Sequence, residues 1–274
     1  MWFLCHNNKI FKKIKMKSTV KKSLFFLGLI ALTVSSCKKD EEDTHTHDEA
    51  TNGQVKVQLT HKWGMETSLF QLNTEYTHPM NGELMTFTKY KYYISNFKLK
   101  KSDGTWWVHP ESYFLVDLSN TSSTLLNLGD LPAGEYTEMS YVLGVDSLRN
   151  VSGAQTGALA ASNAMFWSWN SGYIMVKAEG TSPASSTGSF AFHLGGFSGA
   201  NNVVTTKTIS FASNPLTITA SHASEVHINV NPAMTWCTNG NYCSQVSTIM
   251  MPGTQAKAMA TDFYNGFIFD HIVE

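Results

Sequence analysis

The chain has 274 residues, of which 42% are hydrophobic, enough to bury the core of one large domain. Its formal net charge is -1, only 15% of its residues are charged, and no basic stripe that would favour nucleic acid stands out. We therefore expect a globular protein that has no nucleic-acid partner.

The segment from residue 16 to residue 36 has the layout of an export signal. A basic patch at residues 17–22 precedes the apolar run Leu24–Val34, and two serines lead directly to Cys37. This run is shorter than the roughly 20 residues of a membrane-spanning helix. Small residues before a cysteine resemble a bacterial lipobox, which implies that Cys37 is lipidated and begins the mature chain. The alternative is an ordinary secretory signal with an unmodified cysteine. Residues 1–15 are interpreted as an upstream extension, with Met16 as the initiator.

Residues 37–53 are predicted to be a flexible tether, because they are rich in charge and poor in apolar side chains. Their acidic start, Lys38-Lys-Asp-Glu-Glu-Asp43, resembles the surface-export tag of Bacteroidetes lipoproteins. The resemblance implies a lipoprotein on the outer face of the outer membrane, with a periplasm-facing position as the alternative. His45 and His47 are interpreted as solvated linker residues rather than as weak metal ligands.

The remainder, residues 54–274, shows the periodicity of strands. Apolar side chains alternate with polar ones in four clear segments, at residues 55–61, 139–143, 226–230 and 267–273. The first of these segments places His61 at the end of its apolar face. In the last segment, alternation places Phe267, Phe269, His271 and Val273 on one face.

One helix is predicted, over Thr254–Tyr264, where apolar residues recur at helical spacing. We therefore expect a single all-β domain. The favoured architecture is an antiparallel β-sandwich of the Ig-like, Greek-key type, with long loops and this one short helix near the C-terminus.

The cysteines favour an oxidising compartment. Of the four, Cys5 precedes the signal and Cys37 is the lipidation candidate, which leaves Cys237 and Cys243 on either side of a turn-rich loop. We expect these two to form a disulfide. A dithiol zinc site is the alternative, but the loop is short and further ligands are few.

Several motifs, standing in a fixed order, resemble one family. The two longest are Gly144-Val-Asp-Ser-Leu-Arg-Asn-Val-Ser-Gly-Ala-Gln-Thr-Gly157 and Met165-Phe-Trp-Ser-Trp-Asn-Ser-Gly-Tyr173. The shorter ones are Tyr92-Tyr-Ile-Ser-Asn96, Pro132-Ala-Gly-Glu-Tyr136, Phe192-His-Leu-Gly-Gly196 and Phe269-Asp-His271. Together they resemble the MbnP-like copper-binding proteins from about Gln54 to the end of the chain. Ala160 and Glu274 depart from this pattern, which usually has an acidic residue and a histidine there.

The resemblance and the facing of the histidines together indicate a copper site. Imidazole suits copper, which leads the affinity order of the divalent first-row ions. His61, His193 and His271 stand where the family carries histidines, and His193 has the small neighbours Ala191 and Gly195 on its own face. We expect these three rings to converge. The alternative is that each is a satisfied core histidine.

Tryptophan adds a second expectation that the resemblance implies. In characterised relatives a dihaem partner oxidises a tryptophan to kynurenine, and the modified ring helps to bind copper. The candidates here are Trp63, Trp167 and Trp169. The alternative is that these rings fill the core and edges of the sandwich.

Other chemistries find less support. Asp146, Asn150 and Gln155 offer oxygen ligands for calcium, but hydrogen bonds that cap their loop are the preferred interpretation. No nucleophile elbow, His-Glu-x-x-His helix or phosphate loop occurs, so we expect a protein that is not an enzyme.

A different functional class remains as the alternative to metal binding. It is a surface recognition module in which exposed aromatic residues bind glycan or protein. Its candidate side chains are Trp106, Trp107, Trp167 and Trp169.

Overall fold

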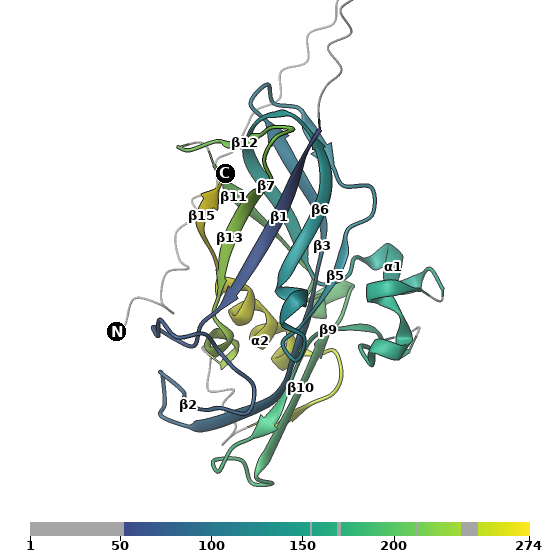
Figure 1. Ribbon diagram of the computed structural model, residues 1–274. Helices are drawn as coiled ribbons and strands as arrows, with labels where there is room; N and C mark the ends of the chain where they lie inside the picture. The colour runs from purple at the N-terminus through teal and green to yellow at the C-terminus, as the bar shows by residue number, and fades with distance from the viewer. Residues whose placement is uncertain (1–51, 154, 169–170, 212, 237–245) are drawn as a thin grey trace, which may run out of the picture. The chain divides into compact units, whose positions relative to one another are not determined.

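The computed structural model describes residues 52–153, 155–168, 171–211, 213–236 and 246–274 (Figure 1). The export signal, Cys37, tether residues 37–51, the Cys237–Cys243 pair and Trp169 lie outside these residues. Residues 52 and 53, predicted as the end of the tether, instead begin the first strand. No helix in the described ranges has the length and apolarity needed to cross a membrane.

The described residues form two sheets. The smaller sheet has four strands, in the order β15 (Phe267–Val273), β13 (Ser224–Val230), β1 (Asn52–His61) and β6 (Leu125–Pro132). The larger sheet follows the path β11 (Thr205–Ser210), β7 (Gly134–Leu143), β3 (Leu84–Lys101), β9 (Gly172–Thr181), β10 (Ser189–Gly195) and β14 (Thr248–Ile249).

Shorter strands complete the larger sheet. Three of them pair with β3, namely β2 (Glu75–Thr77), β4 (Trp106–Val108) and β5 (Tyr113–Asp117). Two more, β8 (Phe166–Ser168) and β12 (Leu216–Ile218), pair with β9 and β7. The predicted all-β sandwich is confirmed. Most strand pairs are antiparallel, but β1 with β13 and β10 with β14 run parallel.

The helical parts are short. The predicted C-terminal helix is confirmed as α2 (Thr254–Asn265). A second helix, α1 (Ser147–Val151), was not predicted because it has only five residues. The 3-10 turns are η1 (Thr121–Thr124), η2 (Gly157–Leu159), η3 (Ala161–Asn163), η4 (Gly199–Asn201) and η5 (Pro232–Trp236).

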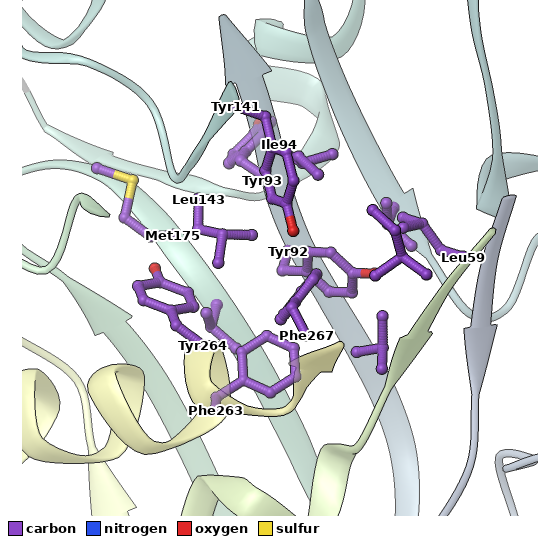
Figure 2. Packing of buried hydrophobic residues seen from close by; sticks show 14 of the residues in the cluster. Leu59, Tyr92, Tyr93, Ile94, Tyr141, Leu143, Met175, Phe263, Tyr264 and Phe267 are labelled. Atoms are coloured by element: carbon purple, nitrogen blue, oxygen red, sulfur yellow. The ribbon is translucent and has the colours of Figure 1, made fainter. Parts of the chain in front are cut away.

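The core forms as the alternation predicts. The apolar face of β1 is buried from Val55 to His61, and the inward residues of β13 are fully buried. Helix α2 packs against β10, β15 and η5. Figure 2 shows Phe263 of α2 beside Tyr92 of β3 and Phe267 of β15, with ring centroids 5.1–5.5 Å apart. Each such buried aromatic contributes about 1.5–3 kcal/mol by leaving water.

The last strand departs from the predicted alternation. In β15, Phe267 and Phe269 face the core as expected, opposite Val230 and Ile228. Between Phe269 and His271 the register slips by one residue, because Asp270 forms a β-bulge. His271 therefore pairs with His227 and is exposed, and Val273 is exposed with it. The prediction that all four shared one face is wrong for His271 and Val273.

Candidate functional site

The two longest motifs pack against each other at the start of β9. Asn150 of α1 is fully buried, and its Oδ1 accepts a hydrogen bond of 2.8 Å from the backbone N–H of Tyr173. Its Nδ2 donates to the carbonyl of Val145 at 2.8 Å. Gly172 is needed at this contact, since its φ is +71° and a Cβ there would lie 2.2 Å from Asn150 Oδ1. Much of the family signature therefore serves to hold this junction together.

Asp146 joins a third motif to the same junction. Its carboxylate accepts hydrogen bonds from the Asn96 side chain at 3.0 Å, from the Tyr113 hydroxyl and from the Arg149 backbone. Burial would raise the pKa of Asp146, but these hydrogen bonds outweigh it and hold the pKa below its usual range. The preferred interpretation of Asp146, Asn150 and Gln155 as loop-capping residues is confirmed, because Gln155 also bonds within its own loop.

His61 lies inside the sandwich. Its Nε2 is 2.9 Å from the hydroxyl of Tyr92, and its ring also has a backbone hydrogen bond to Leu59. Burial lowers the pKa of His61 to about 3 and raises that of Tyr92, so both side chains are neutral near pH 7. This arrangement is that of a satisfied core histidine.

Trp63 is likewise a core residue. Its Nε1 donates to the Thr77 carbonyl at 2.8 Å, and its ring lies among Phe70, Tyr76 and Phe87. His78, which directly follows β2, is also buried here, and its ring centroid is 6.1 Å from that of Trp63. The core interpretation of Trp63 therefore fits its surroundings.

His193 lies on the opposite side of the larger sheet from Phe190 and Phe192, as predicted. Its Nε2 is 2.8 Å from a carboxylate oxygen of Glu179 on β9. The second oxygen of Glu179 binds the Lys89 ammonium at 2.7 Å. This face of β3, β9 and β10 thus carries a charged network that sequence reasoning missed. The sequence feature that could have revealed this network is the alternation of the charged residues Lys89, Lys177 and Glu179 with apolar neighbours.

The charges around His193 set its protonation. Burial lowers the pKa of His193 and the ammonium of Lys177 lowers it further, while Glu179 raises it, with a net lowering. Burial would raise the pKa of Glu179, but its hydrogen bonds with Lys89 and His193 give a net lowering. His193 is therefore neutral near pH 7, and a carboxylate orients its ring. With Nε2 directed at Glu179, Nδ1 remains for a ligand.

Trp167 packs on β10 two residues away from this histidine. Gly195 is two residues from His193 on β10 and so belongs to the same face. A Cβ at Gly195 would lie 2.6 Å from the Trp167 ring, so the indole rests directly on that glycine. The open space expected next to His193 is thus partly filled by the half-buried Trp167. His193, predicted as a metal ligand, and Trp167, predicted as a candidate for modification, are thus connected through Gly195 on the same strand.

The three predicted histidines do not share one site. His61 bonds Tyr92 inside the core, His193 bonds Glu179 on the larger sheet, and His271 stacks on His227 at the outer face of the smaller sheet. Within the ranges that the structure describes, no three His, Cys, Asp or Glu side chains gather closely enough to hold one metal ion. The expected convergence of His61, His193 and His271 is therefore absent there.

Among the residues that the structure describes, the aromatic side chains of the alternative function do not form an open row. Trp106 is 38% exposed and lies under the ammonium of Lys98 at 4.7 Å, while Trp107 and Trp167 are half-buried. Trp167 belongs to the His193 face rather than to the Trp106 strand. The recognition alternative is therefore not favoured.

Comparisons with known proteins agree on one relationship. A family model described as MbnP matches residues 52–251. Among solved structures, MbnP from Methylosinus trichosporium superposes with a TM-score of 0.51 and 13% sequence identity, covering 75% of this chain and 87% of that one. At this identity the likeness shows the fold alone. A search of curated protein sequences found no match.

Proposed function

The chain belongs to the MbnP family, and from this premise we propose that it is an exported, lipid-anchored copper-binding protein. Family membership supports the coarse statement that the protein is copper-related. The finer statement adds that Cys37 carries the lipid, that the domain faces the outside of the outer membrane, and that copper is bound for acquisition, storage or delivery. We propose no catalytic reaction of its own.

The observation that carries the proposal is the carboxylate-oriented His193, with the Trp167 ring packed on Gly195 two residues further along the same strand. Neutral imidazole is a good copper ligand, and His193 is kept neutral by burial. The Glu179 carboxylate orients the ring through Nε2, in the way that carboxylates orient metal-bound histidines. We therefore assign His193 as a copper ligand through Nδ1. His61 and His271 lie in other surroundings and are not part of this site.

Trp167 is the tryptophan whose position favours a role in the same site. Its ring rests on Gly195, on the face that His193 shares. We propose that a dihaem peroxidase-like partner oxidises Trp167 to kynurenine, and that the oxidised side chain then completes the copper site. Trp63 also has a histidine neighbour, His78, with ring centroids 6.1 Å apart, but both side chains are buried and the Trp63 ring is enclosed by other aromatic residues.

The proposal is tested by metal analysis of the protein purified from its own host. We expect copper in the wild type, loss of copper in His193→Ala, and retention in His222→Ala, which removes an exposed histidine of a loop. Trp167→Phe keeps an aromatic ring but cannot form kynurenine, and we expect it to lose copper too. Full copper content in His193→Ala would refute the assignment.

A further inference from the structure

His227 and His271 form a pair on the outer face of the smaller sheet. They are direct partners across β13 and β15, and their rings stack with centroids 4.4 Å apart and planes at 19°. The β-bulge at Asp270 creates this pairing, because regular alternation would have turned His271 toward the core. A bulge that re-aims a side chain is a feature that sheets commonly use next to binding sites.

Oxygen acceptors surround the pair. The Asp270 carboxylate lies 3.1 Å from His271 Nδ1, and the Glu225 carboxylate lies 3.4 Å from His227 Nε2. Within the described residues, Nε2 of His227 is a buried atom that makes no hydrogen bond although the Glu225 carboxylate is near, and Oδ1 of the neighbouring Asn229 is another such atom. Leaving such an atom without a hydrogen bond costs about 1–3 kcal/mol. A ligand that bound these atoms would remove that cost.

From this geometry we propose that His227 and His271 bind a divalent transition-metal ion, copper(II) most tightly, at a site separate from His193. Two imidazoles on one ion at about 2.0 Å each have nitrogens roughly 3 Å apart, a separation within reach of directly opposed residues on paired strands. A turn of each ring about its Cβ–Cγ bond moves the parallel rings into that arrangement.

The neighbouring carboxylates suit this role as supports. Asp270 accepts from Nδ1 of His271, which leaves Nε2 of that ring for the metal. Asp270 and Glu225 also offset the charge of a divalent ion. His227 and His271 supply two protein ligands, so the remaining coordination positions of the metal are open to water or to a small anion. The site does not depend on the proposed function, because it uses neither His193 nor Trp167 and lies on the other sheet.

The test is a copper(II) titration of the purified protein in a His193→Ala background, followed by electron paramagnetic resonance. We expect one bound ion with the hyperfine pattern of two nitrogen ligands. His227→Ala and His271→Ala should each lower the affinity more than about tenfold and remove that pattern. His222→Ala is the matched control and should change neither. Thermal unfolding of each variant reports whether the fold is intact.

The outcomes separate this inference from the proposed function. Copper(II) binding that is unchanged in both His227→Ala and His271→Ala overturns the paired site and leaves the His193 assignment standing. Copper that disappears from host-purified His193→Ala while the paired site still titrates supports both. Copper(II) binding only in a metal-bridged dimer, seen as a doubled mass in solution, overturns a site within one chain. Absence of any copper(II) binding in the His193→Ala background overturns it as well.

Discussion

The histidines inside the sandwich and those on its outer faces differ in what surrounds them. The inner histidines, His61 and His78, are buried beside the rings of Tyr92 and Trp63, and burial lowers the pKa of each. The outer histidines, His193, His227 and His271, have carboxylates beside their rings. The comparison teaches that one residue type serves the fold where its ring is closed in by the core, and is oriented by a carboxylate where it lies on the far side of a sheet from the core.

The largest effect is expected inside the sandwich. His61→Ala removes a buried ring and leaves the Tyr92 hydroxyl unpaired, so we expect the free energy of unfolding to fall by about 3–5 kcal/mol in denaturant titration. Tyr92→Phe should cost less, about 1–3 kcal/mol, because only the hydrogen bond is lost. A change below 0.5 kcal/mol in His61→Ala, on the order of a surface substitution, would break the distinction between inner and outer histidines.

Lowering the pH should destabilise the fold through His61. The pKa of His61 is about 3 in the folded protein and about 6.5 when exposed, so the unfolded chain gains a proton first as pH falls. Its contribution to stability is complete above pH 6.5 and is lost toward pH 3, at about 1.4 kcal/mol per pH unit. Unfolding curves of wild type and His61→Gln between pH 7 and pH 4 measure this. Equal slopes in the two proteins would contradict the burial of His61.

A smaller effect on stability is expected when His193 is replaced. His193→Ala loses a hydrogen bond to a carboxylate that Lys89 still pairs, so we expect a cost of about 1–2 kcal/mol. Its main consequence should be loss of copper. If the variant unfolded while Glu179→Gln did not, His193 would belong with the inner histidines.

The smallest stability effect is expected at the bulge. Asp270→Asn removes the carboxylate beside His271 on an exposed strand, so the free energy of unfolding should stay within about 0.5 kcal/mol. Copper(II) affinity of the His227–His271 pair should nevertheless fall about tenfold, because the ring loses its orienting partner. Unchanged affinity would show that the carboxylate does not support the pair.

The sequence predicted well those features that depend on local periodicity. Alternation identified the buried faces of β1 and β13, and helical spacing identified α2. The bulge at Asp270 could not be predicted, because a single extra residue leaves the apolar pattern of β15 almost unchanged while reversing the facing of His271. The motif resemblance found His193 and Trp167, but the packing of Trp167 on β10 depends on β8 and β10 both pairing with β9, which is tertiary information.

The central claim is that an outer histidine, and not an inner one, holds the copper. The most direct measurement is the copper-to-protein ratio of wild type, His193→Ala and His61→Gln purified from the producing organism under identical conditions. The account predicts copper in the wild type, an unchanged copper-to-protein ratio in folded His61→Gln and a lower ratio in His193→Ala. Copper retained in His193→Ala and lost in a folded His61→Gln would contradict it.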